Sequence, residues 1–352
     1  MIKLFLYILS IFILLAGLIP LIKKDNWAYR IFDYPRFQKL AICVTLIIIW
    51  SFQISEFGFN KETILFYLLV AMSIHLVYDI YPFTFFGKKM VMKTKKLFEN
   101  RPKISVLIMN VYQYNTDYHK VIALVKNVRP DVVLLVETDD KWKNGLAELD
   151  KEYRYSIKKP LENTYGMLFF SKLKILSSET HYLIDEEIPS MEIDVKLSDG
   201  NPLKIYAIHP TPPVPGENPK STERDAEILL VGKKAKEYGR PALVMGDLND
   251  VGWSYTSELF LKTSGLLDPR RGRGMFSTFH AKYFFLRWPL DHIFVSRHFT
   301  LDKIKVEKSI GSDHFPISGK FSLQPDNDNE KLQSDAESEN EAVEKIKNGK
   351  ES

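Results

Sequence analysis

The first 86 residues contain three long apolar runs, at residues 4–22, 40–57 and 64–80, and an aromatic stretch extends the last one to residue 86. A helix needs about 20 apolar residues to cross a hydrocarbon core of about 30 Å, and each run approaches that length. A signal peptide followed by buried helices is the alternative. It is disfavoured because the first run lacks a clear small-residue cleavage site, and three such runs are hard to bury in a soluble domain. The pattern therefore predicts three transmembrane helices.

Two features of these runs bear on function. Aromatic residues that favour the headgroup zone lie near the ends of the runs: Trp27, Tyr29, Trp50 and Tyr81. His75 and Asp79 lie four residues apart on one face of the third run. An intramembrane ionisable pair is a candidate functional site, but the simpler interpretation is preferred. In that interpretation Asp79 lies at the water interface and His75 bonds to a neighbouring helix.

From residue 104 the pattern changes to short apolar runs that alternate with helical segments. Strands are predicted at residues 104–109, 132–136, 166–170, 191–197, 203–208, 242–245, 293–295 and 317–323. Helices are predicted around residues 118–128 and 221–238, the second with Ser221 or Thr222 as its N-cap and Gly239 after its end. Many strands with few helices predict an α/β domain in which two sheets pack face to face with helices outside. Residues 325–352 are polar and acidic, so we expect a disordered tail or a fraying helix with no core of its own.

Charge divides the 352-residue chain in the same way. Residues 1–103 carry 14 basic and 6 acidic side chains, residues 325–352 carry 4 and 9, and the middle has a net charge of only +1. The expected organisation is a transmembrane region (1–86), a basic juxtamembrane linker (87–103), a catalytic domain (104–324) and an acidic tail (325–352). The single cysteine, Cys43, excludes an intramolecular disulfide framework and a cysteine-rich zinc site.

The basic residues also bear on orientation. Five follow the first run, at residues 23–39, and seven follow the third, at residues 88–103, whereas the turn between the second and third runs has only Lys61. Because Lys and Arg favour the cytoplasmic side, this bias places the N-terminus outside and the middle domain inside.

Polar residues suited to metal and phosphate chemistry recur where the predicted strands end. They are Asn110, Glu137, His209, Asp247, Asn249, Asp291, Asp313 and His314. A single Asp or Glu at a strand end is more often a turn or cap residue. Placements at six strand ends in one domain are difficult to explain in that way, so we interpret them as one site.

The motifs around these residues resemble the endonuclease/exonuclease/phosphatase superfamily, which has the DNase I-like fold. Met-Gly-Asp247-Leu-Asn249 and Gly-Ser-Asp313-His314-Phe-Pro are the most specific of them, and the motifs cover essentially residues 104–323 in the family's order. The stretch from Gly272 to Thr278, followed by Pro-Leu-Asp291, looks most like membrane-anchored bacterial members of the VanJ-like group. The resemblance implies a four-layer αββα sandwich with the site at one edge of the two sheets.

The resemblance also implies roles for the residues. Glu137 would bind Mg²⁺ or Mn²⁺, and Asn110 and Asp313 would complete or support that shell. Asp247 would orient or deprotonate the attacking water, and Asn249 would donate to a phosphate oxygen. His314, paired with Asp291, would contact the scissile phosphate, and His209 would be a second donor to it. His292 is interpreted as an ordinary strand residue.

The substrate is the least determined part of this picture. The expected function is hydrolysis of a lipid-linked phosphate or diphosphate, such as a polyprenyl carrier, because the spans hold the site near a bilayer. A membrane-tethered nuclease and a non-catalytic membrane adaptor are the alternatives. A net charge of +1 is a poor electrostatic footprint for nucleic acid. The basic loop with Arg270, Arg271 and Arg273 is either solvated or a clamp for a second phosphate or a lipid headgroup.

The expected location is a bacterial inner membrane. Lys and Arg bias favours a catalytic domain that faces the cytoplasm, whereas the VanJ-like resemblance implies the outer face.

Overall fold

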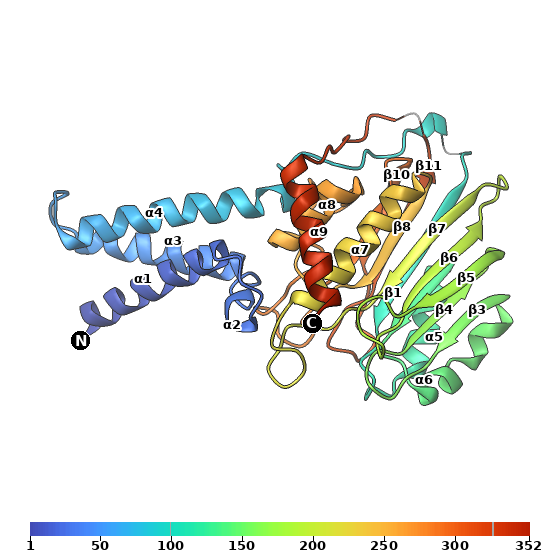
Figure 1. Ribbon diagram of the computed structural model, residues 1–352. Helices are drawn as coiled ribbons and strands as arrows, with labels where there is room; N and C mark the ends of the chain where they lie inside the picture. Colours follow the sequence, from blue (N-terminus) through green and yellow to red (C-terminus); the bar gives the residue numbers. More distant parts are fainter. Residues whose placement is uncertain (99, 326) are drawn as a thin grey trace.

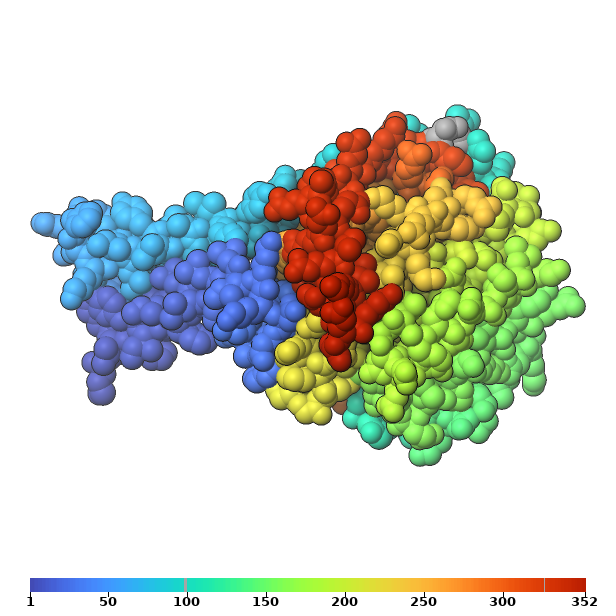
Figure 2. Space-filling model, viewed as in Figure 1, coloured from blue at the N-terminus to red at the C-terminus, as the bar shows by residue number. Residues whose placement is uncertain are grey.

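Three long helices form the N-terminal part of the computed structural model, which describes residues 1–98, 100–325 and 327–352. They are α1 (Ile2–Leu18), α3 (Arg36–Gln53) and α4 (Lys61–Ile80), with the short turns η1 (Ile19–Leu21), α2 (Trp27–Arg30) and η2 (Tyr81–Phe83). We call residues 2–83 the N-terminal bundle. Figures 1 and 2 show it projecting from one end of the remaining chain.

The long helices of the bundle are apolar on their outer as well as their inner faces. Only 28–33% of each apolar window is buried, and Leu4, Phe12 and Ile48 are more than half exposed. The inner face packs around Leu46, Trp50 and Leu69, which are almost fully buried. All three helices are long and apolar enough to cross a membrane.

Eleven strands in the described residues form two mixed sheets. The six-stranded sheet has the order β10-β11-β1-β2-β4-β3, and the five-stranded sheet has the order β5-β6-β7-β8-β9. The strands are β1 (Lys103–Asn110), β2 (Val132–Val136), β3 (Tyr155–Lys159), β4 (Met167–Ser171), β5 (Ile175–His181), β6 (Ser190–Lys196), β7 (Pro202–Ile208), β8 (Ala242–Asp247), β9 (Asp291–Val295), β10 (Phe299–Val306) and β11 (Ile317–Leu323).

Helices cover the outer face of each sheet (Figure 1). The six-stranded sheet carries α5 (Tyr118–Val128) and α6 (Asp140–Gly145), followed by η4 (Ala147–Lys151). The five-stranded sheet carries α7 (Thr222–Tyr238) and α8 (Tyr255–Ser264). A further turn, η3 (Lys96–Phe98), precedes β1. This is the predicted αββα sandwich.

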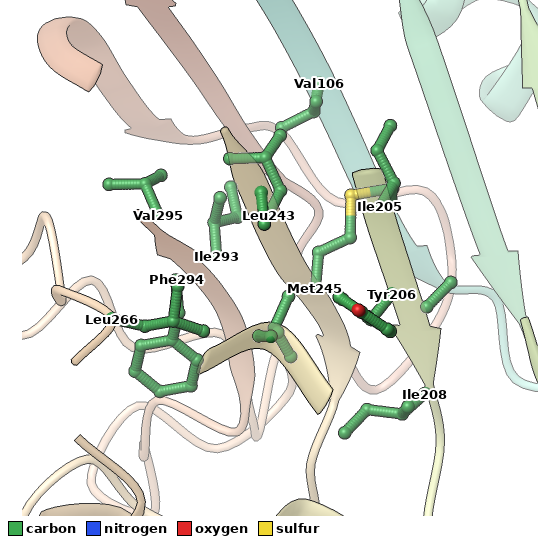
Figure 3. Close-up of a cluster of buried hydrophobic side chains, with 14 of the residues drawn as sticks. Val106, Ile205, Tyr206, Ile208, Leu243, Met245, Leu266, Ile293, Phe294 and Val295 are labelled. Carbon is green, nitrogen blue, oxygen red and sulfur yellow. The ribbon is translucent and has the colours of Figure 1, made fainter. Parts of the chain in front are cut away.

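Successive side chains of a central strand point to opposite faces of its sheet, and both faces are buried. On β1, Val106 and Ile108 point into the core between the sheets, whereas Leu107 and Met109 pack under α5. Figure 3 shows the inter-sheet cluster, with Leu243 and Met245 of β8 beside Ile293 of β9. Each fully buried apolar side chain contributes roughly 1.5–3 kcal/mol, so this core dominates the stability of the domain.

Three strands and two helices were not predicted from the sequence. The strands β3, β5 and β10 all end a sheet in the observed strand orders. β3 is partly buried or exposed at every position, β5 is mostly exposed, and the second half of β10 alternates between exposed and partly buried positions. Edge strands bury little apolar surface, so they lack the apolar runs by which the central strands were recognised. The short helices α6 and α8 were also missed.

The expectation of a disordered tail is wrong, whereas the alternative of a helix with no core of its own is closer to the structure. Residues Ala336–Lys350 form α9, which packs against α7 and α8. A stripe of small and apolar residues, Ala342, Ile346 and Gly349, faces α7, and Asp335 caps the helix by accepting from Ser338 N at 2.7 Å. The acidic composition of the segment concealed this stripe. Charged residues join the interface as well, since Lys345 Nζ lies 3.3 Å from the buried Asp225 carboxylate of α7.

The connection between the first two long helices docks on the αββα domain. Ser221 N donates to Asp25 O at 2.8 Å, and Trp253 Nε1 donates to Asp33 O at 2.9 Å. The Arg30 guanidinium lies 3.5 Å from the Asp225 carboxylate, and both side chains are buried. The bundle and the domain therefore share a built interface on the side where α7 begins.

Candidate active site at the carboxyl edge of the two sheets

Topology brings the predicted site residues to one edge of the sandwich. β1 and β2 are parallel, and so are β7 and β8, so each pair places its carboxyl ends together. Asn110 and Glu137 end or follow the first pair, and His209 and Asp247 the second. Asp291 opens the antiparallel strand β9 directly opposite Asp247. His314 precedes β11, which pairs with β1.

Asn110 links two carboxylates from different sheets. Its Nδ2 donates to Glu137 Oε1 at 2.6 Å and to Asp247 Oδ2 at 2.9 Å. Its Oδ1 accepts from Tyr112 N at 3.0 Å, so the amide is held in one orientation. Asn110 thus positions the carboxylates of Glu137 and Asp247 next to each other.

The backbone around these residues is unusual. Glu137 and Asn249 have φ values of +58° and +50°, in the left-handed region that non-glycine residues seldom adopt. Gly246 is required for a different reason, because a Cβ there would lie 1.8 Å from Ile208 O of the neighbouring strand. Strained backbone is common at functional sites, where the surrounding structure holds it in place.

His314 lies between two carboxylates. Its Nδ1 is 2.8 Å from Asp291 Oδ2, and its Nε2 is 3.5 Å from Asp247 Oδ2. All three side chains are buried, with 6% or less of each exposed. Burial alone would lower the pKa of His314, but Asp291 and Asp247 outweigh it and raise that pKa to about 10. The imidazole is therefore a protonated donor at neutral pH.

The two carboxylates bridged by Asn110 differ in their protonation. Burial, together with the charges of Asp247 and Asp313, raises the pKa of Glu137 to about 7. The hydrogen bond from Asn110 and the charge of His314 lower this pKa, but they do not outweigh the burial. Burial also pushes the pKa of Asp247 upward, but His314, His209 and the Asn110 amide outweigh it and leave that pKa below its usual value. Asp247 is therefore the more acidic of the two.

This donor set fits a divalent cation. The carboxylates of Asp247 and Asp291 flank the His314 imidazole, and Asn110 holds Glu137 beside Asp247. Asp291 Oδ1 has no hydrogen-bond partner among the described residues. The ligand atoms of Asp247, Asp291 and His314 lie within 4.8 Å of one another. Both nitrogens of His314 already face carboxylates, so Glu137 and Asp247 are the residues that could hold a cation with a preference for oxygen ligands.

His209 is buried, and its Nδ1 has no partner among the residues that the structure describes. Burial lowers the pKa of His209 to about 4, so its imidazole is neutral at pH 7. The ring lies 5.3 Å from that of Tyr165. A neutral imidazole beside Asp247 and His314 offers one N–H to a substrate oxygen.

Asn249 is held in part by residues that belong to no recognised motif. Its Nδ2 donates to Pro210 O at 3.0 Å, and its carbonyl accepts from Tyr34 Oη at 2.8 Å and from Arg224 Nη1 at 2.7 Å. Tyr34 lies in the connection before α3, and Arg224 is a fully buried residue of α7. Thr278 supports a different site residue, since its Oγ1 accepts from Asp291 N at 3.2 Å. Thr278 lies within a motif that was recognised, but Tyr34 and Arg224 have no motif of their own.

Asp313 lies at the margin of the cluster. Its side chain is half-buried and accepts from Ser312 Oγ at 3.3 Å. Within the described residues, no hydrogen bond joins it to Asn110 or Glu137. Its effect on the pKa of both Glu137 and His314 shows that its charge is near, but its role as a metal ligand stays a prediction.

The arginine loop is more closely bound to the protein than a solvated loop would be. Arg270 is buried and forms a two-point ion pair with Asp268, and its Nη2 also lies 2.7 Å from His292 Nδ1. Arg271 pairs with Glu258, and Arg273 donates to Val91 O. Each of the three guanidinium groups therefore has a partner within the protein, which favours a structural role for the loop, while Arg270 Nη1 and Arg271 Nε have no hydrogen-bond partner among the described residues. His292 lies on β9, as expected, and its Nε2 is 2.8 Å from Asp250 O.

The His75–Asp79 pair lies far along the chain from this cluster. Asp79 forms an ion pair with Arg36, and His75 Nε2 is 3.6 Å from the Asp79 carboxylate on the same helix. The ion pair connects the start of α3 to the end of α4. Asp79 thus has a structural partner in the bundle.

Comparisons with known proteins agree with this geometry. Residues 109–314 match the family model described as "Endonuclease/Exonuclease/phosphatase family". None of the curated proteins matches the chain in sequence. Similar solved structures share the fold at low identity.

An endonuclease/exonuclease/phosphatase from Beutenbergia cavernae has a TM-score of 0.52 at 18% identity, over 64% of this chain and 72% of that one. A family protein from Bacteroides thetaiotaomicron has a TM-score of 0.52 at 20% identity, over 64% of this chain and 98% of that one. TDP2 from D. rerio, solved with a single-strand DNA product, has a TM-score of 0.51 at 19% identity, over 63% of this chain and 99% of that one. The matched segment spans more than half of the sequence and includes all eight predicted site residues, with His314 as its last position. The chain belongs to the endonuclease/exonuclease/phosphatase family.

Proposed function

We propose that this protein is a membrane-anchored, divalent-metal-dependent phosphoester hydrolase that acts on a lipid-linked phosphate or diphosphate, such as a polyprenyl carrier. The three apolar helices of the N-terminal bundle are the anchor, and the cluster around Asp247 and His314 is the site. The metal we expect is Mg²⁺ or Mn²⁺, because the available ligands are carboxylate and amide oxygens.

One observation carries the choice of substrate. The loop that presents Asn249 is hydrogen-bonded to Tyr34, which lies only two residues before the helix α3. Trp253, four residues after Asn249, donates to Asp33 O in the same connection. A site fixed in this way to the base of a transmembrane bundle lies next to the membrane surface, where a lipid-linked phosphate is concentrated.

The side chains divide the chemistry among them. Glu137, supported by Asn110, would hold the cation, which would supply Lewis-acid stabilisation of the phosphoryl oxygens. Asp247 remains ionised and accepts the proton of the attacking water. The protonated His314 donates from Nε2 to a phosphoryl oxygen, while Asp291 holds the imidazole through Nδ1. His209 and Asn249 donate to the remaining oxygens.

A membrane-tethered nuclease is the second candidate within the same reaction class. The net charge of +1 for residues 104–324 argues against sequence-independent binding of nucleic acid, which depends on Lys and Arg neutralising phosphates. A non-catalytic adaptor is disfavoured because a binding platform does not need a protonated His314 between two carboxylates. The same experiment distinguishes all three.

The test is phosphate release from a polyprenyl diphosphate and a polyprenyl phosphate by the full chain in detergent micelles, with and without Mg²⁺. We expect Mg²⁺-dependent release that Asp247→Asn abolishes and the surface variant Asp140→Asn does not. Nicking of plasmid DNA without release from either lipid would favour the nuclease. Inertness toward every substrate, with an unchanged thermal unfolding profile, would favour the adaptor.

We also propose that the αββα domain faces the cytoplasm of a bacterial inner membrane. The first basic segment lies at the end of the bundle nearest the domain, and the second starts at that same end and runs along the domain to β1 (Figure 1). This arrangement supports one side of the bilayer for both segments. Replacing Cys43 by Ser and introducing a cysteine at Ser177, an exposed position on β5, allows labelling of intact cells with an impermeant thiol reagent. Labelling without cell lysis would place the domain on the outer face instead.

A further inference from the structure

A loop beside the site exposes a continuous aromatic cluster. Tyr283, Phe284 and Phe285 are 51%, 77% and 56% exposed, and Leu286 is 38% exposed. Their rings contact one another, with centroids 5.4 Å apart for Phe284 and Phe285. We call residues 281–287 the aromatic loop. Adjacent large apolar side chains on a surface mark an interaction site more often than scattered ones do.

The base of the aromatic loop is fixed to the active site. Ala281 N donates to Asp313 O at 2.6 Å, and His280 N donates to Leu286 O at 2.8 Å, which closes the loop. Just before it, Phe279 forms bridges to both His314 and Trp288, and its ring centroid is 4.9 Å from that of His314. The cluster therefore lies at the rim of the site.

The tip of the aromatic loop is fixed to the first turn of α3. Gln38 Nε2 donates to Phe285 O at 2.7 Å. Ile42, one turn further along α3, is 37% exposed and is the first large apolar side chain of that helix to face outward. At a rise of 1.5 Å per residue, this turn advances the helix by about 6 Å. The aromatic tip thus lies at the level where α3 enters its apolar, outward-facing stretch.

We propose that the aromatic loop inserts into the headgroup zone of the bilayer and holds the rim of the active site against the membrane surface. The proposal rests on the membrane anchoring of the proposed function, since it needs the bundle to be embedded. Aromatic rings with a polar or charged flank favour this zone, and Lys282 and Arg287 flank the cluster. The partner of the aromatic loop is a phospholipid surface. Contact between the two would bring a lipid-linked phosphate close to His314.

The test measures the depth of the loop directly and does not require activity. The full chain with Cys43→Ser carries a single new cysteine labelled with the fluorophore NBD, and is reconstituted in phosphatidylcholine–phosphatidylglycerol nanodiscs. The three positions are Phe284→Cys at the tip of the loop, Ile48→Cys in α3 and Leu176→Cys on β5. Leu176 is the control, because it is an apolar residue that is 48% exposed at the far edge of the five-stranded sheet. Quenching by headgroup- and acyl-chain spin-labelled lipids is compared with quenching by aqueous iodide.

We expect at least twofold quenching of the Phe284 probe by headgroup-labelled lipid, and protection from iodide relative to the Leu176 probe. Equal iodide quenching at both positions, with the Ile48 probe quenched by acyl-chain labels, would overturn the inference while leaving the anchoring intact. An Ile48 probe that lipid does not quench would overturn the anchoring itself. The Phe284 probe could instead be protected from iodide without any quenching by lipid, and lose this protection on dilution. That result would show that the aromatic cluster contacts a second copy of the chain, and it would also overturn the inference.

A second variant tests the consequence for the substrate. Replacing Tyr283, Phe284 and Phe285 by Ser leaves every residue assigned to the chemistry in place. We expect the KM for polyprenyl diphosphate in nanodiscs to rise at least tenfold, while hydrolysis of a short water-soluble diphosphate ester stays within twofold. An equal loss toward both substrates would show that the loop merely supports the fold of the site.

Discussion

Replacing Asp291 by Asn isolates the interaction that keeps His314 protonated. The two side chains meet at 2.8 Å between Asp291 Oδ2 and His314 Nδ1, in a region where both are almost fully buried. Asn has nearly the same shape as Asp but carries no charge, so the change removes the electrostatic part of the bond. The remaining contact is at best a neutral hydrogen bond.

The expected loss follows from the strength of a hydrogen bond to a charged group, which contributes about 1.5–3 kcal/mol net. If that contribution is made in the transition state, kcat/KM falls by about 10- to 150-fold. The pH profile should change as well, because Asp291 is the largest contribution that raises the pKa of His314 toward about 10. Without it the imidazole loses its proton at a lower pH, so activity in the variant should decline as the pH rises from 7 to 9.

The assay is Mg²⁺-dependent phosphate release from polyprenyl diphosphate between pH 6 and 9, with Asp140→Asn as the matched change at an exposed carboxylate on α6. Thermal unfolding of each variant checks that the fold is retained. If Asp291→Asn keeps activity within twofold of the parent and the same pH profile, the assigned role of the His314–Asp291 pair is incorrect.

Four further predictions use separate parts of the structure. Burial raises the pKa of Glu227 to about 7, although the hydrogen bond from Ser190 lowers it. The native state therefore binds the carboxyl proton of Glu227 more tightly than the unfolded chain does. Its stability contribution is therefore present below pH 4.5 and lost as the pH rises to 7. Glu227→Gln should then leave the unfolding free energy unchanged at pH 4.5 and raise it by about 3 kcal/mol at pH 8 in urea titrations, and a pH-independent effect would contradict this sign. Tyr34→Phe removes the 2.8 Å hydrogen bond to the Asn249 carbonyl and should lower kcat by about fivefold, the equivalent of about 1 kcal/mol. An unchanged kcat would show that this bond does not position Asn249 for catalysis. Gly246→Ala places a Cβ against Ile208 O and should lower the unfolding free energy by about 3 kcal/mol, whereas a stable variant would show that β8 can shift. Glu137→Gln should weaken Mg²⁺ binding by roughly 100-fold in titration calorimetry, and parental affinity would exclude Glu137 as the ligand.

The central strands were predictable because burial on both faces leaves a strong signal. β2 (Val132–Val136) and β11 (Ile317–Leu323) agree with their predicted limits, and β2 is an uninterrupted β-branched and leucine run. Apart from Leu176, the exposed positions of the edge strands β3, β5 and β10 are charged or polar, so these strands give no such signal. The same reasoning failed for α9, where three small or apolar residues are enough to pack a helix in a segment whose composition is acidic.

Site residues were predictable where motifs name them, but their contacts were not. The sequence placed Asn110, Glu137 and Asp247 after separate strands, and parallel pairing explains why they meet. It did not indicate that the Asn110 amide bridges the two carboxylates, because a bond across 137 positions depends on how the two sheets face each other. It also did not place Asp313 at the margin of the cluster.

The sequence alone determined the three apolar helices, the alternating α/β domain and the identities of the chemically active side chains. These properties depend on composition and on periodicity within short segments, which the order of residues specifies directly. Only the tertiary structure decided that Arg270 is paired inside the protein, that Tyr34 holds Asn249, and that the aromatic loop reaches the first turn of α3. Each of these is a contact between segments distant in the chain, and such contacts are fixed by how the sheets, α7 and the bundle pack together rather than by any local pattern.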